Sequence, residues 1–104
     1  MKAKDIIKAY VPYEEGQGGK YRPVLIFILT GNKDEFIGLK ITTKARKQNR
    51  VQLKYWKEAG LHMPSYVQCD NFTVFNSFGN VEYIGTISDE DYKKVTDKFN
   101  ELNK

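Results

Sequence analysis

The chain has 104 residues, a length that fits a single domain over residues 1–104 with one modest core. Hydrophobic residues make up 40% and charged residues 29%, values that argue against disorder. No apolar run approaches the ~20 residues of a membrane span, and the start is too polar for a signal peptide. One cysteine, Cys69, excludes an internal disulfide, and one histidine, His62, excludes most histidine-based metal sites. We therefore expect a cytoplasmic protein that uses no metal or other cofactor.

The net charge of +4 is distributed unevenly. Residues 1–60 hold 13 Lys/Arg and 6 Asp/Glu, whereas residues 61–104 hold 4 and 7. One tract carries seven basic residues and no acidic residue, namely Lys40, Lys44, Arg46, Lys47, Arg50, Lys54 and Lys57. Such a tract is typical of a surface that binds a polyanion, with a solvated loop or strand face as the alternative.

The first half of the chain predicts strands separated by turns. Residues 5–13 form a β-rich run, and residues 14–20 form a loop whose three glycines permit unusual backbone angles. Residues 21–30 contain six consecutive apolar residues and predict a strand buried on both faces. A turn at 31–34 leads into residues 35–43, the second strand of a hairpin.

The middle of the chain is less regular. Residues 51–59 fit either a strand or one or two helical turns, with Gly60 as the stop. Around them the sequence predicts a basic loop or edge strand at 44–50, short strands at 64–69, 71–75 and 81–87, and a turn at 76–80.

The last segment has the clearest pattern. Ser88 can cap a helix, and the carboxylates of residues 89–91 favour its positive N-terminal end. Apolar residues then recur at helical spacing and predict a face directed toward the core, formed by Tyr92, Val95, Phe99 and Leu102. Short strands followed by one helix predict a mainly β (α+β) fold, a small antiparallel barrel with a helix packed on it.

Residues 18–25, Gly-Gly-Lys-Tyr-Arg-Pro-Val-Leu, resemble the Gly-rich loop and Arg-Pro-hydrophobic strand of the MazF/PemK family of toxin endoribonucleases. Further landmarks follow the family's order over nearly the whole chain: Asp5-Ile6-Ile7, Ile41-Thr42-Thr43, residues 64–67 with Asp70, and residues 84–91. The sequence departs from the pattern at Lys4, which replaces an opening glycine, and in carrying both Lys20 and Tyr21 before Arg22.

The resemblance implies the SH3-like barrel of the CcdB/PemK/MazF type, assembled as a homodimer. It implies a toxin of a type II toxin-antitoxin system that cleaves single-stranded RNA without a metal. The substrate's own 2′-hydroxyl attacks the phosphate, leaving a 2′,3′-cyclic phosphate and a 5′-hydroxyl. The implied partners are single-stranded RNA and a cognate antitoxin whose C-terminal segment fills the RNA groove.

Two residues are candidates for catalysis. Attack on a phosphodiester builds negative charge, which the bidentate guanidinium of Arg22 can stabilise; the alternative is an arginine that anchors its loop through an ion pair. Thr42 matches the family's active-site threonine, with a hydroxyl suited to the phosphate or the 2′-hydroxyl; the alternative is a threonine that only favours β structure. Thr43 alternates with Thr42 along the strand, so we expect only one of the two to line the groove, and the resemblance favours Thr42.

Other residues are candidates for RNA binding through backbone N–H groups, cations or a stacking ring: Gln17, Gly18, Gly19, Lys20, Thr43, Lys44, Arg46, Lys47 and Trp56. The alternative for the glycines is a flexible hairpin tip, and for Trp56 it is core or dimer packing. Glu14, Glu15 and Gln17 can supply a base or position the 2′-hydroxyl, with solubility alone as the alternative. A lone histidine such as His62 is usually structural, and Cys69 is expected to be a small buried apolar residue.

A second class of function fits the same residues. A non-catalytic barrel module would bind nucleic acid or poison a protein target, as CcdB does. Arg22 and Thr42 favour the nuclease, and the polar end of the last segment, Glu101-Leu102-Asn103-Lys104, weakens the interpretation as a poison. A third class, a sheet-based interaction protein unrelated to toxins, would make the ordered landmarks coincidental. The RNA sequence cut, the antitoxin and the biological context do not follow from the sequence.

Overall fold

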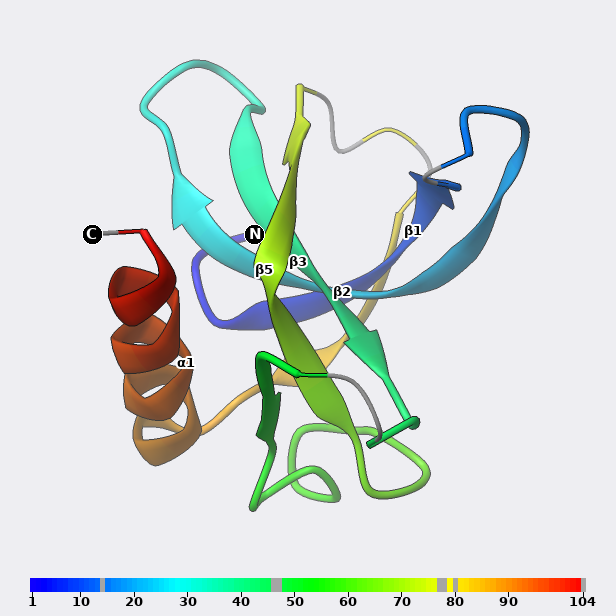
Figure 1. Ribbon diagram of the computed structural model, residues 1–104. Helices are drawn as coiled ribbons and strands as arrows, with labels where there is room; N and C mark the ends of the chain where they lie inside the picture. The colour runs from blue at the N-terminus through cyan, green and yellow to red at the C-terminus, as the bar shows by residue number, and fades with distance from the viewer. Residues whose placement is uncertain (14, 46–47, 77–78, 80, 104) are drawn as a thin grey trace.

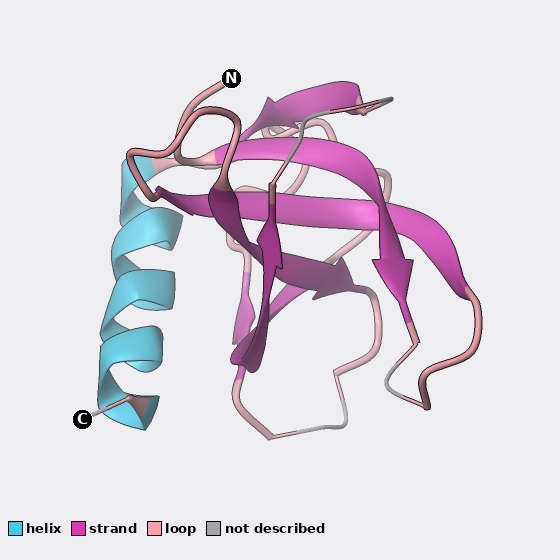
Figure 2. Cartoon of the chain, turned by 90° about the horizontal axis from the view of Figure 1, so that it is seen from above, coloured by secondary structure: helices cyan, strands magenta, loops and turns pink. Residues whose placement is uncertain are grey.

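The computed structural model describes residues 1–13, 15–45, 48–76, 79 and 81–103. Its elements are β1 (Asp5–Pro12), β2 (Gly19–Leu29), β3 (Phe36–Thr42), β4 (Arg50–Gln52), β5 (Tyr66–Phe75), β6 (Glu82–Thr86) and α1 (Asp89–Leu102). The strands form one antiparallel sheet in the order β4-β5-β3-β2-β1-β6 (Figure 1). The sheet curls, and α1 lies along one side of it (Figure 2). The expected mainly β, barrel-like fold with a C-terminal helix is confirmed, with β4 and β6 as the edges of the described sheet.

Bulges bend the long strands. The register shifts between Ile6 and Ile7, between Ile26 and Ile28, and between Leu39 and Ile41. A bulge increases the local twist of its strand, so the sheet can bury apolar side chains on both faces. Residues 24–27 of β2 are each no more than 2% exposed, which confirms a strand buried on both sides there. Ile28 and Leu29 at the end of β2 are exposed.

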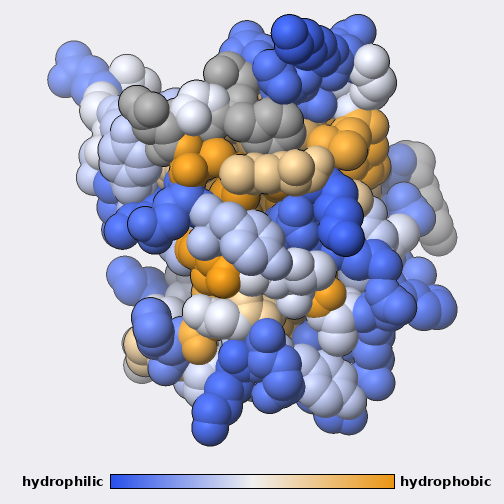
Figure 3. Space-filling view, turned by 180° about the vertical axis from the view of Figure 1, so that it is seen from behind, coloured by the Kyte–Doolittle hydropathy of each residue, from blue (hydrophilic) through white to orange (hydrophobic). Residues whose placement is uncertain are grey.

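Two cores result from this curvature. The main core lies on the helix side and includes Leu25, Phe27 and Val95. A second core on the other face includes Val24 and Ile26 of the same strand. Seen from behind, the surface is largely hydrophilic, with smaller hydrophobic areas between polar side chains (Figure 3).

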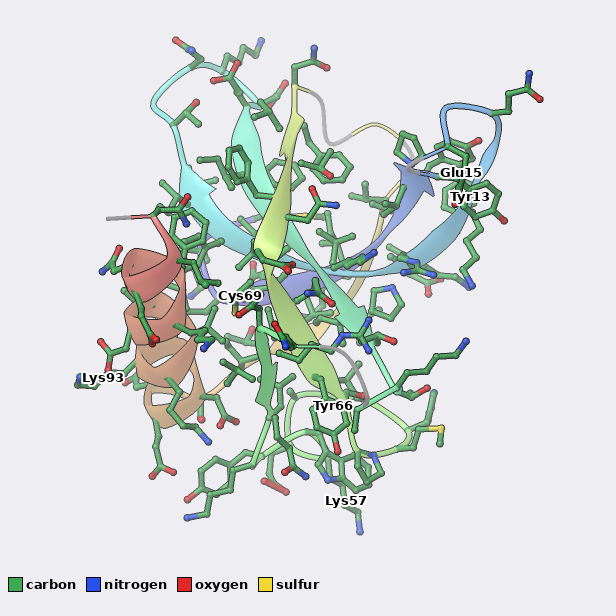
Figure 4. All side chains as sticks on the ribbon, in the orientation of Figure 1. Tyr13, Glu15, Lys57, Tyr66, Cys69 and Lys93 are labelled. Atoms are coloured by element: carbon green, nitrogen blue, oxygen red, sulfur yellow. The ribbon has the colours of Figure 1, made fainter. Side chains whose placement is uncertain are left out.

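Cys69 lies on β5 within the main core, as expected for a small apolar residue (Figure 4). Its side chain is fully buried. Burial raises the pKa of its thiol to about 11. The thiol therefore stays protonated and inert in the folded protein.

The helix has the predicted cap and core face. Ser88 Oγ accepts a hydrogen bond of 3.1 Å from the backbone N–H of Asp91. Val95 is buried, and Tyr92, Phe99 and Leu102 pack against the main core. No helix within the described ranges is long and apolar enough to cross a membrane.

Two central segments differ in detail from the predictions. Residues 51–59 become the short strand β4 followed by turns over residues 54–60, since only residues 50–52 find a partner in β5. Gly60 ends this region with a φ of +90°, a conformation that favours glycine. The two strands expected at 64–69 and 71–75 are one strand, β5, because its pairing with β3 continues past the exposed Asp70.

Candidate nucleic-acid interface

The site lies where two neighbouring strands part. β2 begins at Gly19, but its pairing with β3 begins only at Val24, opposite Lys40. Within the described residues, the first part of β2, residues 19–23, pairs with β1 alone. Figure 1 shows the β1–β2 hairpin and the lower end of β3, at Thr42, diverging on the right of the view. An open groove of about 970 Å³ lies between them.

The groove is basic and rich in hydroxyl groups. Its cations are Lys20, Arg22, Lys44 and Arg50, and its hydroxyl-bearing residues are Tyr21, Thr42, Thr43 and Ser65. None of the described residues that line it is acidic, so its potential is positive and attracts anions. In the described part of the chain, no cluster of three or more His, Cys, Asp and Glu side chains could hold a metal ion.

Arg22 comes from the open part of β2, opposite Ala9 of β1, and is half-buried. Strand alternation places its side chain on the same face as Val24, which belongs to the second core. Within the described residues the guanidinium makes no hydrogen bond or ion pair with a protein group. Its donors therefore face the groove without an anchoring carboxylate from this part of the chain.

Thr42 is the last residue of β3 and is held by a local turn. Its Oγ1 accepts a hydrogen bond of 3.2 Å from the backbone N–H of Lys44, which leaves the hydroxyl proton free to be donated. The pairing of β2 with β3 stops at Val24 and Lys40, two residues short of both Arg22 and Thr42. The two predicted catalytic residues thus lie on adjacent strands and line one groove.

Thr43 lines the same groove as Thr42. The expectation that only one of the two threonines would do so is wrong. β3 ends at Thr42, so the strict alternation of a strand no longer applies to the next residue.

Arg50 is a groove residue that the sequence indicated only as one member of the basic tract. Its Nε donates a hydrogen bond of 2.5 Å to Gln68 Oε1, and its guanidinium also donates to the carbonyl of Lys44. Gln68 and Asn49 also donate side-chain hydrogen bonds to the Asp70 carboxylate. Burial alone would raise the pKa of this carboxyl, but these hydrogen bonds outweigh burial and lower it. The bonds of Arg50 to Gln68 and Lys44 tie the loop after β3 to β5, so Arg50 positions this wall of the groove. Its partner Gln68 lies 18 residues further along the chain and could not be read from the basic tract.

The candidates at the hairpin tip are separated from those in the groove. Lys20 and Lys44 line the groove, whereas Gln17, Gly18 and Gly19 do not. Figure 4 shows the tip, where Tyr13 is labelled on the side away from α1. A Cβ on Gly19 would lie 2.5 Å from the carbonyl oxygen of Val11, so close packing of the hairpin requires this glycine.

Trp56 is placed away from the groove. It is partly buried and packs against the main core, the alternative considered for it. His62 and Glu15 are exposed and do not line the groove. Arg46 and Lys47, predicted to bind RNA, lie with Glu14 outside the described residues.

Comparisons with known proteins agree with this geometry. The family of PemK-like, MazF-like toxins of type II toxin-antitoxin systems matches residues 2–102. A small, curled antiparallel sheet with a C-terminal helix is the fold of this class of toxin. The chain belongs to the PemK-like, MazF-like toxin family.

Several solved structures share the fold. A MazE–MazF structure from Deinococcus radiodurans has a TM-score of 0.72 at 16% identity, covering 99% of this chain and 94% of that chain. A mycobacterial endoribonuclease in complex with its cognate antitoxin has a TM-score of 0.78 at 14% identity, with coverages of 99% and 94%. The Mycobacterium tuberculosis toxin MazF-mt6 has a TM-score of 0.71 at 21% identity, with both coverages at 95%. No curated protein matches the chain significantly.

Proposed function

We propose that this toxin is an endoribonuclease that cleaves single-stranded RNA in the basic groove. The observation that carries the proposal is that Arg22 and Thr42, from the parts of β2 and β3 that no longer pair with each other, line one groove with four cations and no described acid. A guanidinium without a protein partner in the described part of the chain suits a ligand with a phosphodiester charge. We assign catalysis to Arg22 and Thr42, and backbone contacts to Lys20, Thr43 and Lys44.

The proposed reaction uses a nucleophile from the substrate. The RNA 2′-hydroxyl attacks the adjacent phosphorus, loses its proton to the medium, and forms the new P–O bond. The bond to the 5′-oxygen breaks, and that oxygen takes up a proton, leaving a 2′,3′-cyclic phosphate and a 5′-hydroxyl. Arg22 stabilises the charge that grows on the phosphate oxygens, and Thr42 donates its hydroxyl proton to one of them. Neither step requires a metal.

The oligomeric state, the location and the protein partner of the toxin are part of the proposed function. We propose that the protein is a cytoplasmic homodimer and that a cognate antitoxin neutralises it by occupying the same groove. A solved structure of the same fold is an endoribonuclease in complex with its cognate antitoxin, which supports an antitoxin as a partner. Light scattering of the purified protein measures the dimer, and competition between antitoxin and RNA measures the shared groove.

The test is cleavage of a long single-stranded RNA in excess chelator, with the ends of the products mapped. We expect discrete cuts with 5′-hydroxyl ends from the wild type. For Arg22→Ala we expect a cleavage rate that is lower by at least about 100-fold. Lys33→Ala, which removes an exposed cation in the β2–β3 turn, is the matched control and should cleave normally. Intact long RNA and intact total cellular RNA, with folded protein, would refute the nuclease and favour the non-catalytic binding module.

A further inference from the structure

Tyr21 is the one aromatic side chain among the described residues that line the groove. It lies on the open part of β2, directly between Lys20 and Arg22, and its side chain is 55% exposed. Nothing in the proposed cleavage chemistry uses this ring. An exposed aromatic ring beside cations is the combination that single-stranded nucleic acid binds, because every base has a face that can stack.

Tyr10 holds the ring in a defined orientation. The two tyrosines face each other across β1 and β2, and their ring centroids are 5.6 Å apart at an interplanar angle of 74°. In such an edge-to-face pair, Tyr10 covers at most one face of Tyr21. Tyr21 remains 55% exposed beside this contact, and the cross-strand contact limits the rotation of the side chain before any ligand binds.

The open edge of β2 brings the ring and Arg22 to the same ligand. Consecutive strand residues point to opposite faces, so Tyr21 and Arg22 would normally be separated by the sheet. Within the described residues, however, β3 does not pair with this part of β2, and both residues line the groove. An RNA strand that crosses this edge meets a guanidinium for its phosphate and a ring for the base beside it.

We propose that Tyr21, oriented by Tyr10, is the stacking platform for the unpaired nucleobase next to the phosphate held by Arg22. This inference rests on the proposed function and adds the residue that selects single-stranded over paired RNA. Stacking accepts any base, so Tyr21 contributes affinity and the requirement for an unpaired base rather than sequence preference. A base locked in a duplex cannot present its face to the ring.

The test measures binding separately from cleavage. The probe is a short single-stranded RNA that spans a mapped cut site and carries a 2′-deoxynucleotide there, so that it binds without being cut. We expect Tyr21→Leu to bind it about 10-fold more weakly and Tyr21→Phe to bind within about twofold of the wild type. Tyr83→Leu is the matched control, because Tyr83 is also 55% exposed but lies on β6, away from the groove. Tyr21→Thr keeps a strand-favouring residue without a ring and repeats the test if leucine disturbs the fold.

An abasic scan identifies the base that stacks. Removing one particular base should weaken binding to the wild type by about the factor seen for Tyr21→Leu, and should have little further effect on that variant. Binding by Tyr21→Leu and Tyr21→Thr as tight as by Tyr83→Leu, or the same abasic profile as the wild type, would overturn the role of Tyr21 and leave cleavage at Arg22 intact. A wild type that cuts no RNA would refute the proposed function, and this inference with it.

Discussion

Asp91, in the first turn of α1, accepts a hydrogen bond of 2.9 Å from the backbone N–H of Tyr55, in the turns that follow β4. The other carboxylate oxygen accepts from the backbone N–H of Lys54 at 3.0 Å and pairs with Lys94 Nζ at 3.1 Å. The Asp91 side chain is fully buried. One acidic residue thus joins the start of the helix to a segment 36 residues earlier in the chain.

Replacing this carboxylate should destabilise the fold. Asp91→Ala leaves two backbone N–H groups without their acceptor, and we expect it to lower the free energy of unfolding by about 3 kcal/mol. The control is Asp97→Ala, which breaks an exposed pair with Lys93 and should cost about 0.5 kcal/mol or less. Urea unfolding at neutral pH measures both. Similar losses in the two variants would contradict the anchoring role.

Asp91 should also give stability a specific dependence on pH. Burial alone would raise the pKa of its carboxyl, but the hydrogen bonds from Tyr55, Lys54 and Lys94 outweigh burial and lower it. A lowered pKa means that the stabilisation is complete above the unfolded-state pKa of about 3.9 and is lost as the pH falls through the folded-state pKa. The stability difference between wild type and Asp91→Asn should therefore shrink below about pH 4. A difference that stays constant from pH 6 to pH 3 in urea unfolding would refute this.

The hydroxyl of Thr42 should affect the rate of cleavage more than the affinity for RNA. Thr42→Val keeps the shape but removes the proton donor, and we expect cleavage to slow by about 100-fold. Thr42→Ser keeps the hydroxyl and should retain most of the activity. Thr43→Val is the neighbouring control, with an expected effect of less than about threefold on the rate. Single-turnover kinetics on a short substrate measure the cleavage rate of each variant. A larger loss of rate in Thr43→Val than in Thr42→Val would assign the catalytic hydroxyl to Thr43 instead.

Lys4 occupies a backbone conformation that suits glycine. Its φ is +80°, which costs a non-glycine residue about 1 kcal/mol. Its side chain compensates by pairing with Asp89 and by lying over the Tyr92 ring, with Nζ 5.5 Å from the centroid. We expect Lys4→Ala, which keeps the strain and loses both contacts, to be less stable than Lys4→Gly by about 1 kcal/mol in urea unfolding. Equal stability of the two variants would show that the positive φ at residue 4 does not strain a non-glycine residue.

Gly85 allows β6 to approach the turns that follow β4. A Cβ at Gly85 would lie 1.9 Å from the carbonyl oxygen of Ala59, a backbone atom that cannot move aside cheaply. We expect Gly85→Ala to lower the free energy of unfolding by about 3 kcal/mol or more, or to prevent folding. Gly16→Ala is the comparison: its Cβ meets nothing within 4 Å, and only its φ of +88° opposes alanine, at about 1 kcal/mol. Thermal unfolding of the two variants should differ clearly, and equal midpoints would refute the steric argument.

Features with local causes were readable from the chain alone. The cap at Ser88 and the spacing of Val95 and Phe99 predicted α1, because caps and helical periodicity act over a few residues. The apolar run in β2 predicted a strand buried on both faces, because a run of consecutive apolar residues is likewise a local pattern. The ordered motifs indicated the toxin family, and the match over residues 2–102 confirms it.

Placement within the groove depended on contacts between distant segments. Arg22 and Thr42 were named from motifs, but the groove that both residues line forms only where β2 and β3 part. Trp56 and Tyr21 are both aromatic residues beside cations, and no local pattern says which of them is buried. Trp56 packs against the main core, whereas Tyr21 stays exposed on the part of β2 with which β3 no longer pairs. Where two strands stop pairing is a property of the folded sheet, so the tertiary structure alone decides which of the two rings lines the groove.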